Sequence, residues 1–499
     1  MFKRLAELIR RKPMIGWGIF TLAMVGVFVL GLLAASVTEH RAEISTLYAN
    51  KIVDIKGINP LNEQWGLNYP REYDTWRKTQ NMDFSSKHLG NTPEDVLESR
   101  PEMVILWAGY AFSRDYSAPR GHMHAIEDIT ATLRTGAPDE NTKDMQPSTC
   151  WTCKSPDVPR VMQEKGLAEY YKAAWSENGC EIVNPIGCAD CHNPETMALS
   201  ISRPALVEAY ERQGKNIEDA TPQEMRSLVC AQCHVEYYFK GEGKYLTFPW
   251  DKGTSVEQME EYFDNASYAD YTHTLSRTPI IKAQHPDYEL FIAGPHGQRG
   301  LSCADCHMPY KSEGGIKYSD HQVMSPIKNI ASTCQTCHRD SEENLKKYIY
   351  EYQDKALEIR DRVETELAKA HILAKTAWDN GAKESAMKPV LKLIREAQWR
   401  WDFAVASHGG SFHAPVETQR ILAHSLDKSL LAQLEVQKVL YSLGVKDVKM
   451  PDISTKAKAQ KYIGLDMDKL VKQKQEWLEK TPPAWLEKAK GEGKIISKK

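Results

Sequence analysis

The chain has 499 residues, 26% of them charged, and a formal net charge of −3 at pH 7. A chain of this length normally folds into two or three domains. The near-neutral balance, without a basic stripe that carries interleaved aromatic residues, argues against nucleic-acid binding. If the substrate is an anion, its site therefore needs a local positive charge that the chain as a whole does not provide.

The N-terminus predicts a membrane-spanning segment. Residues 1–13 hold five basic side chains, and an uncharged, mostly apolar run from 14 to 36 follows. This run is long enough to cross a bilayer as a helix, and the basic residues before it place residues 1–13 in the cytoplasm. Ala34-Ala35-Ser36 could still be a cleavage site, but a cleaved signal usually has a shorter apolar stretch, so we favour a membrane anchor. In either case we expect the chain after residue 36 in the periplasm.

Residues 37–340 are irregular, rich in proline, glycine and aromatic residues, and contain every cysteine. Ten of the eleven cysteines lie in five motifs: Cys188-x-x-Cys191-His192, Cys230-x-x-Cys233-His234, Cys303-x-x-Cys306-His307, Cys334-x-x-Cys337-His338 and Cys150-x-x-Cys153-Lys154. Cys-x-x-Cys-His is typical of a c-type haem, in which both thiols bind the porphyrin and the histidine binds the iron. Zinc sites do not require a histidine directly after the second cysteine. The motifs therefore predict five covalently bound haem c groups, which would also fill much of the core.

The motif that ends in Lys154 differs from the other four. A lysine must be neutral to donate its lone pair to iron, and deprotonating it near pH 7 costs about 4–5 kcal/mol. Burial and the bond to iron must offset this cost. In the alternative interpretation the motif is degenerate and Lys154 faces water. We favour ligation, because such a ligand would not arise casually at a haem-attachment site. A lysine on one side of the iron could leave the opposite side open for a substrate.

Haems that only carry electrons usually take a second axial ligand. Twelve histidines lie outside the motifs. Turn-rich contexts, from which a side chain can be aimed at a cofactor, favour His122, His296, His321 and His413. His124 and His408 are their rivals.

From residue 341 onward the pattern becomes helical. Long helices are predicted at 341–379, 383–407 and 415–443, each followed by a glycine-containing end signal. Residues 341–450 thus form a scaffold without cysteine, and exposed apolar stripes on such helices favour a homodimer interface. The predicted apolar stripe of the first helix includes Tyr348 and Tyr352. Residues 451–499 hold twelve lysines against seven acidic residues, and we expect a surface helix with a disordered end.

With these motifs the chain resembles cytochrome c nitrite reductase, the ammonia-forming pentahaem cytochrome c-552 family. Supporting stretches lie at 113–116, 133–136, 233–238, 282–286 and 398–402, and the resemblance covers about residues 57–453. It implies a mainly α multihaem cytochrome c fold, with an irregular haem-packed region and long C-terminal helices. It also implies an oxidoreductase that forms homodimers, reduces nitrite to ammonium with six electrons, and receives them from a membrane-bound quinol-oxidising cytochrome.

The resemblance further implies a role for each matching residue. The haem on Cys150 and Cys153, with Lys154, would be catalytic, and its distal residues would be Arg134, Tyr237 and His285. The other four haems would be bis-histidine, in the pairs His192–His321, His234–His122, His307–His413 and His338–His296. One calcium ion would bind the Glu236 carboxylate, the Gln284 side-chain oxygen and the carbonyls of Tyr237 and Lys282, since all-oxygen donors suit a hard cation.

Without the resemblance, each of the three distal residues also has an ordinary structural interpretation. Arg134 could pair with a carboxylate or a haem propionate, Tyr237 could be part of an aromatic core, and His285 could be a satisfied loop histidine. Three other functions also stay open. A pentahaem electron carrier without substrate predicts six-coordinate iron throughout, a related reductase would prefer hydroxylamine or sulfite, and a metal-binding scaffold predicts zinc without haem.

Overall fold

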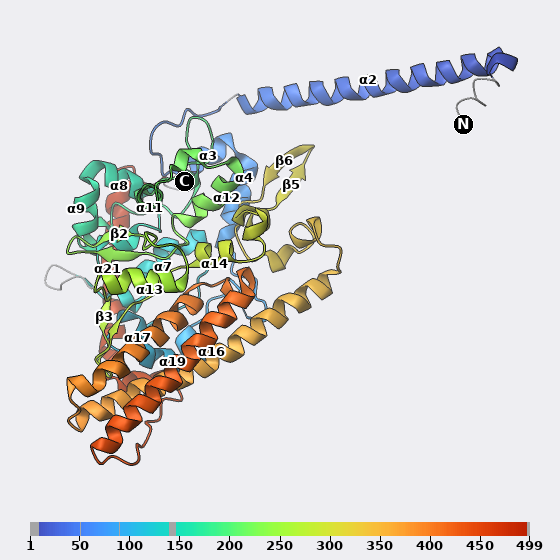
Figure 1. Cartoon of the computed structure of the whole chain (residues 1–499). Coiled ribbons are helices and arrows are strands. Elements are labelled where there is room, and N and C mark those ends of the chain that lie inside the picture. Colours follow the sequence, from blue (N-terminus) through green and yellow to red (C-terminus); the bar gives the residue numbers. More distant parts are fainter. Residues whose placement is uncertain (1–8, 50, 89, 139–145, 497–499) are drawn as a thin grey trace. The chain divides into compact units, whose positions relative to one another are not determined.

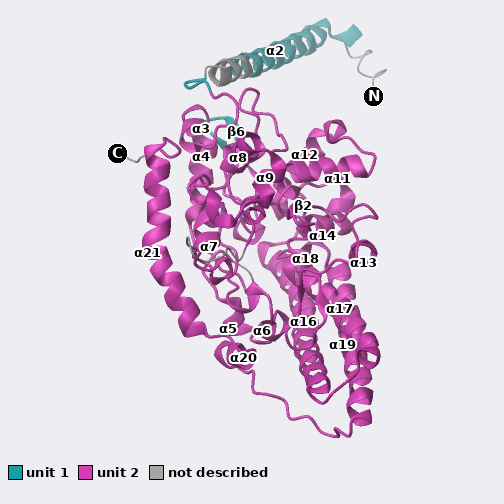
Figure 2. Ribbon diagram, turned by 90° about the vertical axis from the view of Figure 1, so that its left-hand side faces the viewer, with its two compact units in different colours: residues 1–54, 312–317 teal, residues 55–311, 318–499 magenta. Residues whose placement is uncertain are grey.

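The computed structural model describes residues 9–49, 51–88, 90–138 and 146–496 (Figure 1). The chain divides into two compact units, residues 1–54 with 312–317 and residues 55–311 with 318–499 (Figure 2). The three stretches that composition distinguishes, 37–340, 341–450 and 451–499, all contribute to the second unit. Residues 1–8 of the predicted cytoplasmic segment lie outside the described residues, as do residues 497–499.

The first unit contains one long helix, α2 (Pro13–Ala49). Its stretch Pro13–His40 has a mean hydropathy of 2.4 and is long and apolar enough to cross a membrane, a property that a signal sequence shares. The helix continues past the predicted end at residue 36, because no glycine or proline interrupts residues 32–49.

Residues 55–340 form short helices, single turns and short strands, and all of them except 312–317 belong to the second unit. The α-helices are α3 (Asn62–Asn68), α4 (Pro70–Arg77), α5 (Val96–Ser99), α6 (Glu102–Leu106), α7 (Ala125–Ala131), α8 (Asp157–Lys165), α9 (Leu167–Lys172), α10 (Cys188–Cys191), α11 (Pro204–Arg212), α12 (Pro222–Ala231), α13 (Val256–Asn265), α14 (Asp287–Ala293) and α15 (Cys303–His307). The 3₁₀ turns are η1 (Lys78–Gln80), η2 (Ala111–Ser113), η3 (His122–His124), η4 (Leu133–Thr135), η5 (Ser148–Trp151), η6 (Trp175–Asn178), η7 (Ile217–Asp219), η8 (Gly297–Arg299), η9 (Pro326–Asn329) and η10 (Cys334–Thr336).

Three two-stranded sheets complete this region. Their strands are β1 (Tyr238–Lys240), β2 (Tyr245–Thr247), β3 (Tyr271–Thr272), β4 (Pro279–Ile280), β5 (Tyr310–Glu313) and β6 (Ile316–Ser319). Strands β1 and β2 pair antiparallel, with Phe239 opposite Leu246. The little strand content agrees with the mainly α fold class.

The cysteine motifs fold as helical turns, namely α10, α15, the end of α12, and the 3₁₀ turns η5 and η10. Residues three and four positions apart share one face of a helical turn. Both cysteines and the ligand that follows them can therefore reach the same cofactor. Within two of the motifs, Asp190 and Asp305 also close their own turns by accepting the backbone N–H of Gly187 and Ser302.

Three long helices confirm the predicted C-terminal scaffold: α16 (Glu342–Asp379), α17 (Glu384–Ala406) and α19 (Pro415–Ser442), with the short α18 (Gly410–His413) before the last. They pack side by side (Figure 1). Helix α16 begins where the Ser341 side chain accepts the Asn344 N–H. It ends before Gly381, whose φ of +85° is a conformation that glycine adopts without strain. Tyr348 and Tyr352, which belong to the predicted apolar stripe of this helix, are each 44% exposed.

Two hydrophobic cores built around tryptophans stabilise the second unit. The first surrounds Trp151, Trp175, Trp250 and Trp399, and the second combines Trp107 and Trp401 with apolar residues of α16, α17 and α19. A buried ion pair between Lys282 Nζ and Asp402 Oδ1, at 2.9 Å, ties the loop before α14 to α17. Removing one partner of such a pair typically costs about 3–5 kcal/mol.

The C-terminal region contains α20 (Lys456–Tyr462) and α21 (Met467–Gly491). Figure 2 shows α21 running along one side of the second unit. Most residues of α21 are exposed, which confirms the expected surface helix, while the segment after it is held in place, rather than disordered, as far as Lys494. Helix α21 buries Lys474, Trp477 and Ala489, and Lys494 beyond it forms an ion pair with Glu181.

Candidate active site

Three pairs of histidines have the spacing of two ligands on one metal ion. The ring centres are 6.2 Å apart in each of the pairs His192–His321, His296–His338 and His307–His413. Two imidazoles that bind opposite sides of one metal, with nitrogens about 2.0–2.1 Å from it, have ring centres about 6 Å apart. The structure therefore brings these predicted pairs together at a distance that fits a shared haem iron.

The fourth predicted pair lies beside the Lys154 motif. Burial lowers the pKa of His122 to about 4, and the nearby charges of His234 and Lys154 contribute to this. The charges of both groups thus act on His122, but among the described residues no ring contact joins His122 to His234 as in the other three pairs. The rival His124 is otherwise engaged, since its Nδ1 lies 3.0 Å from Glu127 Oε2.

Nδ1 of four of these histidines has a partner, which is of one of two kinds. In His192, His307 and His321, Nδ1 lies 2.9 Å from a backbone carbonyl oxygen. In His234, Nδ1 instead lies 3.6 Å from Oδ2 of Asp287. A carboxylate behind a metal-binding histidine fixes its tautomer and makes it a more basic ligand. Asp287, which the sequence analysis missed, thus distinguishes this site from the others.

Asp287 also faces the predicted distal histidine. Nδ1 of His285 lies 3.7 Å from the same carboxylate oxygen. This nitrogen is buried and has no hydrogen-bond partner among the described residues. The centre of the His285 ring is 5.8 Å from that of His234 and 5.3 Å from that of His408. The other carboxylate oxygen of Asp287 accepts a hydrogen bond from Ser407 Oγ at 2.9 Å. The donors of His234, His285 and Asp287 lie within 4.8 Å of one another, which is also the spacing of a metal site.

The motif that contains Lys154 packs against tryptophans. The Trp151 ring stacks on Trp175 at 4.8 Å and 6°, and its Nε1 donates to the Trp175 carbonyl at 2.9 Å. Burial raises the pKa of the Cys150 thiol to about 12, while Arg134 and Lys154 act to lower it. Both positive side chains therefore approach the same sulfur atom, as expected if they share one site.

Arg134 lies on η4 and is oriented by its neighbours. Its Nε donates to Thr132 Oγ1 at 3.1 Å, and its guanidinium lies 4.5 Å from the centre of the Phe112 ring. Thr132 Oγ1 in turn donates to Asp115 Oδ2 at 2.8 Å. No carboxylate of the described residues lies within ion-pair distance of Arg134, so its charge is available to an anion.

Tyr237 and His285 belong to two segments that a hydrogen bond joins. Glu236 directly precedes Tyr237, and Gln284 directly precedes His285. The Gln284 N–H donates to Glu236 Oε2 at 2.7 Å and so connects the two segments. Burial raises the pKa of Tyr237 well above its ordinary value, and the Cys153 sulfur adds to this. Tyr237 thus lies near the Lys154 motif and keeps its proton at neutral pH.

The predicted calcium ligands lie together, and their chemistry fits a hard cation. Glu236 is fully buried, and its Oε1 has no hydrogen-bond partner among the described residues. Burial raises its pKa well above the ordinary value, and the nearby Glu289 contributes. The Gln284 carboxamide lies 3.2 Å from the Lys282 carbonyl oxygen. An uncompensated buried carboxylate is costly, and a cation bound by oxygen atoms would stabilise it.

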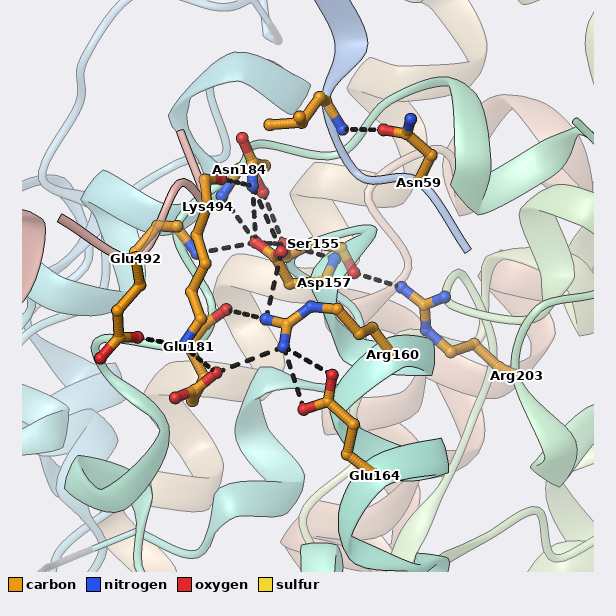
Figure 3. Close-up of polar contacts among 12 residues, drawn as sticks. Asn59, Ser155, Asp157, Arg160, Glu164, Glu181, Asn184, Arg203, Glu492 and Lys494 are labelled. Carbon is orange, nitrogen blue, oxygen red and sulfur yellow. Dashed lines mark hydrogen bonds and ion pairs between the residues drawn. The ribbon is translucent and has the colours of Figure 1, made fainter. Parts of the chain in front are cut away.

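Three cysteine motifs meet at a residue that the sequence analysis missed. Arg203 is 2% exposed and donates to the carbonyls of Thr152 and Ser155 at 2.6 and 2.7 Å and to Asp190 Oδ1 at 2.6 Å. Gln232, inside the third motif, donates to the Asp190 carbonyl at 2.8 Å. Figure 3 shows Arg203 reaching Ser155. These bonds fix the three motifs relative to one another.

Cysteine motifs on helical turns, with histidines paired at ligand spacing, define a multihaem c-type cytochrome. The cytochrome c552 family model matches residues 62–494. The cytochrome c-552 of Bacteroides thetaiotaomicron is 65% identical over 484 residues, which cover 97% of this chain and 98% of that protein. That of Bacteroides fragilis is 64% identical over 481 residues, which cover 96% and 98%. The chain therefore belongs to the cytochrome c552 family, and covalent c-type haem is its cofactor.

A solved structure resembles the whole fold. The cytochrome c nitrite reductase of Desulfovibrio desulfuricans, whose catalytic subunit has two calcium sites, is 28% identical, with a TM-score of 0.74. The match covers 84% of this chain and 91% of that one. The predicted fold, a mainly α multihaem cytochrome c with long C-terminal helices, is thereby confirmed.

Proposed function

We propose that this chain is an ammonia-forming nitrite reductase whose catalytic haem is held by Cys150, Cys153 and Lys154. Family membership and the likeness to a solved nitrite reductase support this function. The observation that carries it is Arg134, a guanidinium that Thr132 and Phe112 orient without a carboxylate partner among the described residues and whose charge acts on the Cys150 sulfur of one motif. That motif is the one in which lysine replaces histidine.

The residues around this motif supply what nitrite reduction requires. When bound, the catalytic haem supplies an iron for the nitrite nitrogen and the electrons that reduce it. Arg134 provides a fixed positive charge and hydrogen bonds for the nitrite oxygens. Tyr237 holds a proton at its hydroxyl. His285 would carry a proton to be delivered at Nε2 in its imidazolium form, whose Nδ1–H faces the negative charge of Asp287. Reduction to ammonium takes six electrons and eight protons, so both groups must be reprotonated during each turnover.

We assign the other four haems to electron delivery. Their axial ligands would be the pairs His192–His321, His234–His122, His307–His413 and His338–His296. Three of these pairs have the ligand spacing described above. Several haems in one chain supply electrons in quick succession, so partly reduced intermediates need not leave the site.

We place a calcium ion at the Glu236 carboxylate, the Gln284 side-chain oxygen and the carbonyls of Tyr237 and Lys282. A cation there would neutralise the buried Glu236 and raise the positive potential beside His285. The solved relative has two calcium sites, and this set of ligands accounts for one.

We further propose that α2 anchors the protein to the cytoplasmic membrane, with the catalytic unit in the periplasm. The basic residues before the apolar stretch support this orientation. A quinol-oxidising membrane cytochrome would then donate the electrons. A homodimer through α16 and α19 is supported by large apolar side chains that are 44–61% exposed there: Tyr348, Tyr352, Leu431, Leu434 and Tyr441.

Replacing Lys154 by leucine tests the proposed catalytic haem. We expect nitrite turnover to fall at least about a hundredfold, because the iron loses its ligand and the geometry at the reacting centre. The four histidine-ligated haems should stay, as judged by absorbance. The control is Lys172→Leu, an exposed lysine on α9. Near-normal turnover of Lys154→Leu, measured with reduced viologen, would show that the catalytic site lies elsewhere.

A further inference from the structure

The C-terminal helix α21 holds the turn that carries Arg134. Lys474 is only 3% exposed and extends inward from this helix. Its Nζ donates to Thr135 Oγ1 at 3.0 Å and to the Gly136 carbonyl at 2.7 Å. Thr135 is the last residue of η4, so these bonds fix the end of the turn, while Asp115 fixes its beginning by accepting the Leu133 N–H at 3.0 Å.

The same face of α21 reaches the Lys154 motif through tryptophans. The rings of Trp477 and Trp485 lie 6.0 and 5.7 Å from Trp175. Trp175 stacks on Trp151, which lies within the motif. Trp477 also donates from Nε1 to the Pro138 carbonyl at 2.7 Å, two residues past the bonds of Lys474. One helix face thus contacts the segments on which the catalytic arginine and the catalytic haem are carried.

The end of the helix is fixed as well. Lys494 Nζ lies 2.6 Å from Glu181 Oε2, and its carbonyl accepts from Asn184 Nδ2 at 2.9 Å (Figure 3). Asn184 also donates to the fully buried carboxylate of Asp157, at the start of α8. A Cβ on Gly179 would lie 2.3 Å from the Trp485 ring, so that ring packs directly on the backbone. These contacts leave α21 little freedom to slide.

We propose that α21 is a positioning element of the active site, in which Lys474 and Trp477 fix the Arg134 turn relative to the Cys150–Lys154 motif. The inference rests on the proposed function and adds residues outside the haem ligands and the distal residues. Arg134 binds the anion before and during the reaction, so its displacement weakens nitrite binding more than it slows the chemical step. A displacement of about 1 Å can cost about a hundredfold.

Lys474→Met in the full-length, haem-loaded protein tests the inference. This change keeps the apolar stem and removes both bonds to the turn. We expect the KM for nitrite to rise about ten- to a hundredfold, with a smaller change in kcat. The dissociation constant of sodium nitrite, from the absorbance change of the oxidised protein, should rise by the same factor. Lys472→Met, an exposed lysine on the same helix, is the control and should match the wild type.

Trp477→Phe is a second variant, which keeps an aromatic ring but loses the bond to Pro138 and part of the packing on Trp175 and Trp485. It decides the question if Lys474→Met does not fold, and it should also raise KM and the dissociation constant of nitrite. Wild-type nitrite binding in the folded variants, with only a lower unfolding temperature, would overturn the inference and leave α21 a purely structural element. A wild-type protein without nitrite-dependent turnover would instead overturn the proposed function, and the inference with it.

Discussion

Asp287 lies between two histidines that have different proposed roles. One of its carboxylate oxygens is 3.6 Å from Nδ1 of His234, the proposed haem ligand, and 3.7 Å from Nδ1 of His285, the proposed distal residue. Its negative charge makes His234 a more basic ligand and stabilises a proton on His285. Under the proposed roles, the same carboxylate would act on an electron-transfer haem and on proton delivery.

The variant Asp287→Asn keeps the shape of this side chain and the oxygen that accepts from Ser407. We expect kcat for nitrite to fall about ten- to a hundredfold, because His285 loses the charge that orients it. The reduction potential of the His234 haem should rise, because a less basic histidine stabilises oxidised iron less. Turnover and spectroelectrochemical titration measure the two effects. Asp427→Asn, an exposed carboxylate on α19, is the control, and unchanged kcat together with an unchanged potential would exclude this role.

Residues within a motif could be predicted from the sequence, because haem attachment requires two cysteines and a ligand on one helical turn. The residues that connect motifs could not. Arg203 binds Thr152 and Asp190, which belong to two different motifs, and no local spacing marks such a contact. Asp287 directly follows His285 and Pro286, but only the fold brings His234 to it.

At the scale of an element, the packing of α21 likewise could not be predicted from its sequence. Its composition is rich in lysine, and Pro482 and Pro483 lie inside it. Proline within a helical pattern normally indicates the end of a helix. The sequence of this segment is therefore typical of a solvated tail, and it did not predict the buried face that contains Lys474 and Trp477. The long helices α16, α17 and α19, by contrast, follow their predicted ranges because their ends carry clear glycine signals.

Lys474 makes the stability of this element depend on pH. Burial lowers the pKa of Lys474 from 10.5 to about 7, and Asp115 opposes this shift. Between these two values the unfolded chain binds the proton that the folded chain has lost, so the free energy of unfolding rises with pH. Below pH 7 both states are protonated and the contribution is constant. Measured by urea unfolding, the difference in the free energy of unfolding between the wild type and Lys474→Met should grow by at most about 4–5 kcal/mol from pH 7 to pH 10. A difference that does not change with pH would contradict this.

At the scale of the whole molecule, the sequence predicted the class of fold better than the arrangement of the helices and turns within it. The irregular region has no regular apolar period, because haem and tryptophan take the place of such a pattern in its cores. Its short helices and turns could not be placed from periodicity for that reason. The histidine pairs join distant parts of the chain, and only the resemblance to a family suggested which residues would meet.

Reduction of nitrite to ammonium is the central activity proposed for this protein. The most direct test is anaerobic turnover of the purified, haem-loaded protein with reduced viologen and nitrite, with ammonium measured against the electrons consumed. We expect one ammonium for each six electrons, at a rate that saturates with nitrite. No nitrite-dependent oxidation by a protein with five intact haems would contradict the account and indicate an electron carrier.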